Sequence, residues 1–268
     1  MLSSVQLGGL STSASASLRP EDLGALTPGQ VRGFSTRAFA AFTLEQVGAF
    51  TPAQIAGISG AQLGALRGGY PGSPVNGESG NAVISALRTE VIAALSSAQV
   101  IGLRADQLSV LSPVQLGTLN PGALRAIVAD AFRGLGSDQV GALTSGQVMA
   151  LSGEQLAAMD SGSGGGAPEM SSLRGLQPGA LAALSSAQVG ALPARWASGL
   201  TLEQFSALPG QVLRGLSTEA LSMLADPYSS GGSGKFSMLS SAALSGMSAA
   251  QVASLVTMGG GGSIFGTV

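Results

Sequence analysis

The sequence contains no cysteine and no histidine. These absences exclude disulfide bridges, thiolate chemistry, the usual zinc ligands and the side chain that most often serves as general acid or base. The many serines have no histidine to activate them, so nucleophilic catalysis lacks a base. We therefore expect a protein that is not an enzyme, with no catalytic, cofactor-binding or metal-binding residues.

Charge is also scarce. Charged residues make up 10% of the chain, against about 25% in an ordinary soluble domain. The net charge is −2 and Lys235 is the only lysine, so no basic field can gather phosphate groups and nucleic acid is excluded as a partner.

Long apolar runs are missing although hydrophobic residues reach 45%. No segment approaches the ~18 uninterrupted apolar residues of a membrane span, so we predict no transmembrane insertion. The opening "MLSSVQLGGLSTSASASLRPE" lacks the basic start and apolar core of a secretory signal.

The feature that the sequence has in abundance is a repeat of eight residues. Each octad reads apolar, Ser or Thr, often Pro, any residue, Gln, apolar, any residue, small residue. We call the first apolar residue the anchor; the first uninterrupted series of anchors is Leu18, Leu26, Phe34, Phe42, Phe50, Ile58 and Leu66. Fourteen of the sixteen glutamines fall four residues after an anchor, in what we call the glutamine slot. Such a fixed period predicts a repeat architecture.

The period fits neither a long helix nor a strand. At 100° per residue, eight residues leave the anchor rotated by about 80° per repeat, so no apolar stripe forms along a continuous helix. In a strand, the two apolar positions of an octad would point to opposite faces. Each octad must therefore end one element and begin another.

Helix-start signals explain the octad. With Thr51 as N-cap, Pro52 takes the first helical position and Gln54 completes a capping box. Phe50 and Ile55 then form the hydrophobic staple across the helix start. The predicted structural capping pairs include Thr27 with Gln30, Thr43 with Gln46, Thr51 with Gln54, and Ser112 with Gln115.

Charges and small residues follow the same frame. Acidic side chains favour the positive N-terminal end of a helix and basic ones the negative C-terminal end. The second helical position holds Glu21, Glu45, Glu90, Asp106, Asp138, Glu154, Glu203 and Glu219, and arginines one turn later are Arg32, Arg125, Arg133, Arg174 and Arg214. Gly or Ala usually precedes the next anchor, which would let neighbouring backbones approach closely.

No octad can fold alone, because burying two apolar side chains stabilises it by less than the entropy cost of ordering eight residues. Stability has to come from stacking on neighbouring octads. We predict an all-α superhelical solenoid of very short helices, interrupted by Gly/Ser-rich loops.

Glycine-rich breaks divide the octads into four arrays. We favour the interpretation that these breaks are flexible loops bulging from one continuous solenoid over the alternative that they separate domains. The predicted segments are array 1 at 1–66, a loop at 67–86, array 2 at 87–159, a loop at 160–167, array 3 at 168–224, a loop at 225–235, array 4 at 236–258 and a flexible tail at 259–268.

The phrases "LSPVQLGTL", "LNPGALRAI" and "LTPGQVRGF" resemble the mesothelin, stereocilin and otoancorin family, whose chains carry strings of such octads. The resemblance covers the arrays and implies a superhelix of short helices without catalysis, doing adhesive or matrix-attaching work outside the cell. The chain departs from that family in having no cysteine, no N-glycosylation sequon, no evident signal and no anchor.

Two functions remain open. The first is a structural or adhesive scaffold that associates with itself or with matrix proteins. The second is a soluble binding module that holds an extended peptide or an apolar ligand along a superhelical groove. Its candidate contacts are Trp196, which stands in a glutamine slot, Tyr70 and Tyr228.

Four carboxylates near the breaks raise the question of a metal site. None has the alternating acidic spacing of a calcium loop, so we expect solvated loop charges. They are Glu78, Asp160, Glu169 and Asp226.

Overall fold

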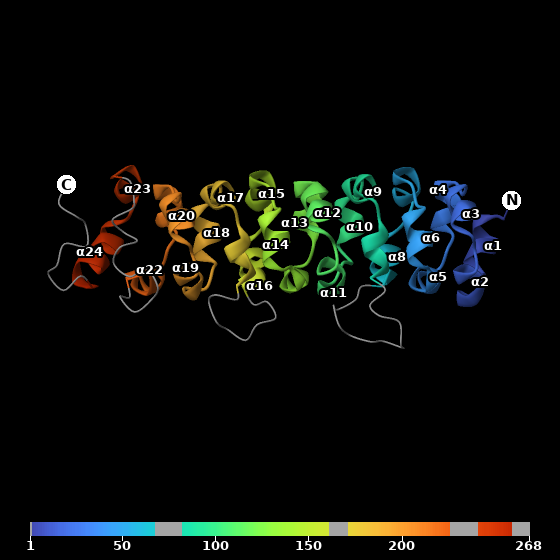
Figure 1. The fold of residues 1–268 in the computed structure, drawn as a ribbon, viewed down its shortest axis with the longest axis horizontal. Coiled ribbons are helices and arrows are strands. Elements are labelled where there is room, and N and C mark those ends of the chain that lie inside the picture. Colours follow the sequence, from blue (N-terminus) through green and yellow to red (C-terminus); the bar gives the residue numbers. More distant parts are fainter. Residues whose placement is uncertain (1, 68–81, 161–170, 226–240, 259–268) are drawn as a thin grey trace. The chain divides into compact units, whose positions relative to one another are not determined.

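The computed structural model describes residues 2–67, 82–160, 171–225 and 241–258, and within these ranges every regular element is a helix (Figure 1). Most helices have four to six residues and begin where their octads are expected to restart. The predicted all-α solenoid of short helices is confirmed. The chain forms two compact units, residues 1–135 and residues 136–268.

The described helices of the first unit are α1 (Ser4–Gly8), α2 (Thr12–Ala16), α3 (Pro20–Gly24), α4 (Pro28–Arg32), α5 (Thr36–Ala41), α6 (Leu44–Gly48), α7 (Pro52–Ile55), α8 (Gly60–Ala65), η1 (Val83–Ala86), α9 (Thr89–Ala93), α10 (Ser97–Val100), α11 (Ala105–Leu108), α12 (Pro113–Thr118), α13 (Pro121–Ala126) and η2 (Ala129–Gly134). Those of the second unit are α14 (Ser137–Gly141), α15 (Ser145–Ala150), α16 (Gly153–Asp160), η4 (Ser172–Gly175), α17 (Pro178–Ala182), α18 (Ser186–Gly190), α19 (Arg195–Ser198), α20 (Leu202–Ser206), α21 (Gly210–Leu213), α22 (Thr218–Ala225), α23 (Ser241–Ser245) and α24 (Ala249–Met258).

Most of the described helices pack on the third helix after them. In the first unit α1 contacts α4, α2 contacts α5, α3 contacts α6 and α4 contacts α7. In the second unit the pairs include α14 with η4, α15 with α17, α16 with α18 and α17 with α20. One turn of the solenoid therefore consists of three octads, or 24 residues.

The core of each unit is built from the two apolar positions of the octad. Phe50 and Ile55, the predicted staple, both have 0% of their surface exposed. Four phenylalanine rings of α4 to α7 and their junctions pack with centroids 5.2 to 6.5 Å apart in neighbouring pairs. Successive turns stack over these side chains, which explains how helices of under two turns remain stable.

Small residues let the backbones of stacked turns touch. A Cβ atom added to Gly57 would lie 2.6 Å from the carbonyl oxygen of Pro28 in the preceding turn. A Cβ atom on Gly175 would collide with the carbonyl group of Ser137. Glycine before the anchor is therefore required at these positions by contact between turns, as the small-residue slot predicts.

The break between arrays 1 and 2 is shorter than the predicted loop at 67–86. Residues 83–86 form η1, which has no side-chain cap but buries Val83 and Ile84. The octad pattern misses this helix because a Ser/Thr cap and a glutamine are both absent there. The residues at 68–81, 161–170, 226–240 and 259–268 lie outside the described part of the chain, so the single continuous solenoid stays a prediction.

No helix in the described ranges is both long and apolar enough to cross a membrane.

Candidate functional site

Each predicted cap pair is joined by two reciprocal hydrogen bonds. Thr51 Oγ1 accepts from the backbone N–H of Gln54 at 3.3 Å, and Gln54 Oε1 accepts from the backbone N–H of Thr51 at 2.9 Å. The same two bonds join Thr27 to Gln30, Thr43 to Gln46 and Ser112 to Gln115. Each pair fixes the start of one short helix.

The glutamines also make a second set of bonds, which the sequence reasoning missed. Gln54 is 2% exposed, and its Nε2 donates to the carbonyl oxygens of Leu26 at 2.7 Å and Leu23 at 2.8 Å in the preceding turn. Gln46 and Gln115 donate in the same way to carbonyls 28 residues earlier. One side chain therefore starts its own helix and fastens it to the turn before.

A signal for this second role is present in the sequence. A glutamate would complete the same capping box, yet no glutamate occupies the glutamine slot. A carboxylate has no N–H to donate, whereas the amide can accept through Oε1 and donate through Nε2. The choice of glutamine over glutamate in this slot points to a donated bond.

The pairing between turns continues across the breaks within each unit. Without a break, the donor glutamine follows the accepting anchor by 28 residues. Across 68–81 the separation is 41 residues, from Gln107 to Leu66, and across 161–170 it is 37 residues, from Gln188 to Leu151. In each case a slot glutamine still donates to the carbonyl of an anchor in the preceding turn. The extra residues of a break therefore do not change which positions of the octad pair.

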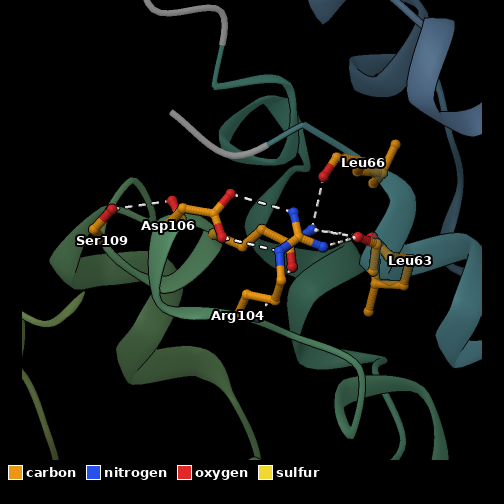
Figure 2. Close-up of polar contacts among 7 residues, drawn as sticks. Leu63, Leu66, Arg104, Asp106 and Ser109 are labelled. Atoms are coloured by element: carbon orange, nitrogen blue, oxygen red, sulfur yellow. Dashed lines mark hydrogen bonds and ion pairs between the residues drawn. The ribbon is translucent and has the colours of Figure 1, made fainter. Parts of the chain in front are cut away.

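Arginine or asparagine in the N-cap slot also bonds to the preceding turn. Arg104, shown in Figure 2, donates from Nη1 to the carbonyl oxygen of Gly64 at 2.6 Å and pairs through Nε with Asp106 at 3.1 Å. Asn120 Nδ2 donates to the Leu95 carbonyl at 3.0 Å. Asn120 also caps its own helix, because its Oδ1 accepts from the backbone N–H of Ala123 at 2.7 Å.

The acidic residues predicted at the second helical position all lie in the first turn of a helix. At Glu45, bonds from its own backbone N–H and from the Thr43 hydroxyl hold the carboxyl pKa below its ordinary value. At Asp22, the hydrogen bond from Arg19 lowers the carboxyl pKa. In the described part of the chain, no three acidic residues gather as a metal site would require.

The first turn leaves one of its faces open. Gln6 has the capping box of its slot but is exposed. Leu2 is 45% exposed, and Leu18 and Leu26 are half-buried, whereas the anchors from Phe34 to Leu66 and from Leu87 to Met159 are buried.

These leucines line a groove. Its volume is about 310 Å³, and its lining includes Leu2, Leu7, Leu18, Leu23, Leu26 and Asp22. We call this surface the first-turn face. The residues that sit here occupy the slots through which later turns pack on their predecessors.

A second unusual place lies where α16 meets η4 and α19. Trp196 fills a glutamine slot and is 3% exposed, and its Nε1 has no hydrogen-bond partner within the described structure. Among the described residues, the hydroxyl group of Ser171 also has no partner, although it is buried. The carbonyl oxygen of Met159 accepts from Ser172 Oγ at 2.6 Å, in place of a glutamine amide. We call this place the Trp196 junction.

The junction also holds a buried carboxylate. The Asp160 side chain is 1% exposed and pairs through Oδ2 with Arg195 Nε at 2.8 Å. The prediction of a solvated loop charge at Asp160 is wrong, because α16 extends through this residue and Arg195 compensates its burial. Glu78, Glu169, Asp226, Tyr70 and Tyr228 lie outside the described residues.

The regular octads are what the comparison with protein families detects. An ALTTAQ repeat model matches residues 15–52 and 119–153. The matched stretches include helices α3 to α6 and α13 to α15, and together they cover less than a third of the chain. Comparison with curated proteins gives no significant match.

The match supports a repeat protein and lends no support to the mesothelin, stereocilin and otoancorin resemblance. The first-turn face and the Trp196 junction are places where this chain departs from its own octad repeat.

Proposed function

We propose that this chain is a non-enzymatic repeat scaffold that associates with copies of itself. The observation that carries the proposal is the first-turn face. It presents leucines and an amide in slots through which later turns pack on earlier ones, and Leu2 there is 45% exposed. A surface already shaped to receive an octad turn favours a partner built from octad turns.

The use of the polar side chains supports a structural role over catalysis. In slot glutamines such as Gln54 and Gln107, both the oxygen and the nitrogen of the side-chain amide are hydrogen-bonded to backbone groups. The carboxylates lie at helix starts, where they interact favourably with the helix dipole. Attachment to matrix outside the cell is the finer part of the proposal, and it rests on the family resemblance alone.

Sedimentation velocity of the purified chain over a wide concentration range tests the proposal, together with electron microscopy of the same samples. A scaffold of this kind is expected to show a mass that rises with concentration. A constant monomer mass at every concentration would contradict it.

A second function, binding of an extended peptide, is favoured by the Trp196 junction. Two buried donors without acceptors, Trp196 Nε1 and Ser171 Oγ, suit the carbonyl groups of a peptide backbone. Trp196 is the only tryptophan of the chain, so its fluorescence reports on the junction alone. Titration with unstructured peptides should shift the emission of the native chain if the junction binds them; an unchanged spectrum counts against this function.

A further inference from the structure

Helix α19 is joined to its neighbours by fewer hydrogen bonds than the helices on either side of it. Its N-cap, Ala194, makes no side-chain hydrogen bond, whereas Ser185 caps α18 and Thr201 caps α20 with complete capping boxes. The glutamine slot of α19 holds Trp196, and the slot of α22, which packs on α19, holds Ala220. Neither residue makes the amide bond that joins other turns, so α19 lacks this bond in both directions.

Trp196 also buries a polar group that has no partner. The register across the second break joins Gln188 to Leu151, 37 residues earlier. Position 196 follows Met159 by the same 37 residues, and the Met159 carbonyl oxygen accepts from Ser172 Oγ. Within the described residues the indole Nε1 has no hydrogen-bond partner, although Trp196 is only 3% exposed. A buried donor without an acceptor destabilises the closed arrangement, because water can satisfy the same donor in an open one.

The contact between α19 and α16 adds a second cost. Arg195 Nε pairs with Asp160 Oδ2 at 2.8 Å, and the Asp160 side chain is 1% exposed while that of Arg195 is 44% exposed. The desolvation of a buried carboxylate offsets much of its attraction to the partner charge. In an open form both charged groups regain water, so the pair holds α19 less firmly than its short distance suggests.

Helix α21 provides an internal reference for α19. It also has neither a side-chain cap nor a slot glutamine, but its slot residue, Val212, is apolar and 0% exposed. In the described structure no buried side-chain donor or acceptor of α21 is without a partner. The two helices therefore share the missing cap and amide, and they differ in the buried polar groups.

We propose that α19 detaches locally from α16 and α22 while the rest of the second unit stays folded, and that this opening exposes the side chains of Trp196 and Asp160. The opening is a property of the chain alone and goes beyond both proposed functions. It would also admit a peptide to donors that are buried in the closed form, and only this consequence rests on the second proposed function. Local openings of this kind occur where tertiary interactions are weakest.

Native-state hydrogen exchange of the full chain, followed by NMR, tests the opening at single amides. The anchor that follows each helix donates its backbone N–H to the carbonyl three residues earlier, so these amides make equivalent bonds. The amides to compare are Leu200 after α19, Leu208 after α20 and Leu216 after α21, with N to O distances of 3.3, 3.1 and 3.0 Å. All three leucines are buried. The protection factor of each amide corrects for its own intrinsic exchange rate.

Two substitutions at adjacent positions should change the protection of Leu200 in opposite directions. Trp196→Phe keeps an aromatic ring in the slot and removes the unpaired N–H. Arg195→Ala leaves the Asp160 carboxylate buried without its charge partner. Arg214→Ala is the matched control, because it removes an arginine beside the reference helix α21 whose hydrogen bond is exposed.

In the native chain we expect the protection factor of Leu200 to be about tenfold or more below those of Leu208 and Leu216, as one buried unpaired donor would produce. Trp196→Phe should raise the Leu200 value about fivefold or more. Arg195→Ala should lower it about tenfold or more without changing Leu208. Arg214→Ala should leave Leu200 at its native value.

Equal protection of the three anchors in the native chain would overturn the inference, because the second unit would then open only as a whole. An unchanged or lower Leu200 value in Trp196→Phe would overturn it as well. If Arg195→Ala fails to fold, the native chain and Trp196→Phe still decide the question.

The outcome also separates this inference from the second proposed function. A peptide-induced shift of the Trp196 emission without faster exchange at Leu200 would remove the inference and leave the peptide-binding function standing. Faster exchange at Leu200 without such a shift would support the local opening and count against peptide binding.

Discussion

The glutamine slot concentrates the stabilising interactions of each octad in a single side chain. Gln54 is 2% exposed; it accepts from its own N-cap and donates to three carbonyl oxygens of the preceding turn. Its loss removes a cap and takes a donor from carbonyl groups of the preceding turn, among them that of Leu26. The two roles are separable by substitution, because they use different atoms of the amide.

Gln54→Ala is expected to destabilise the fold by about 2–4 kcal/mol, combining ~1 kcal/mol for a lost cap with ~1–3 kcal/mol for buried unsatisfied groups. Gln54→Glu keeps the cap acceptor but loses the donor and buries a charge, so its cost should be at least as large. Denaturant unfolding measures both. Gln211→Ala is the control, since Gln211 is exposed and outside the slot; a near-native Gln54→Glu would show that the donated bonds are unimportant.

Glycine substitutions separate contact between turns from helix propensity. Gly175→Ala would push a methyl group against the Ser137 carbonyl and should destabilise the fold by roughly 1–3 kcal/mol. Gly179 lies within α17 with nothing near its absent side chain. Gly179→Ala should therefore be neutral or stabilise by up to about 1 kcal/mol. Equal effects in thermal unfolding would contradict the close approach of the turns.

The helix-start carboxylates predict a small dependence of stability on pH. The pKa of Glu45 is lowered in the folded chain by its backbone N–H and the Thr43 hydroxyl. A folded-state pKa below the unfolded one means that the stabilisation is present above the unfolded value, near 4.3, and is lost as the pH falls through the folded pKa. NMR titration should place the Glu45 midpoint below that of an unfolded peptide, and a midpoint at or above it would contradict the assignment.

At the scale of the element, the octad is a unit of register. Its anchor and second apolar residue reach the core only when the cap, glutamine and next anchor keep their spacing. The breaks show the converse, because the separation between a glutamine and its accepting anchor grows from 28 to 41 residues while the pairing stays the same. Extra residues between arrays are tolerated, whereas we expect extra residues within an octad to destabilise the fold.

One alanine inserted after Gln54 is expected to destabilise the fold by about 2–5 kcal/mol, since it displaces a buried anchor from the core. One alanine inserted between residues 67 and 82 should change the stability little. Chemical unfolding of the two variants compares them directly. Similar losses from both insertions would mean that the octad register has no structural role.

Much of the element could be predicted from sequence for physical reasons. Thr51 caps the helix, Pro52 supplies the φ angle of the first helical position, and Gln54 accepts from the N-cap backbone N–H. All three roles depend only on neighbouring residues. The three-octad turn and the bond from Gln54 to Leu26 could not be predicted in this way. Both depend on contacts between residues 28 apart, and an eight-residue period alone does not determine how many octads complete a turn.

The exceptions to the repeat were predictable only in part. Trp196 stands out in a glutamine slot, but nothing local indicates that its Nε1 is buried without a partner. Asp160 sits beside a glycine-rich break and looks solvated in the sequence. Its burial depends on Arg195, 35 residues later.

At the scale of the whole molecule, the account rests on the number of octads in a turn. The absence of cysteine makes labelling simple, because every introduced cysteine is unique. The second helical positions of α4, α5, α6 and α7 are suitable, since Gly29, Arg37, Glu45 and Ala53 are all exposed and occupy the same slot. Spin labels at Gly29 and at one of the other three sites report separations of one, two and three octads.

The decisive measurement is the set of these three distances by pulsed electron paramagnetic resonance. Stacking of α7 on α4 predicts that the pair three octads apart, Gly29 with Ala53, gives the shortest distance of the three. Distances that increase steadily with sequence separation, or a minimum at the Gly29 and Glu45 pair, would contradict a turn of three octads.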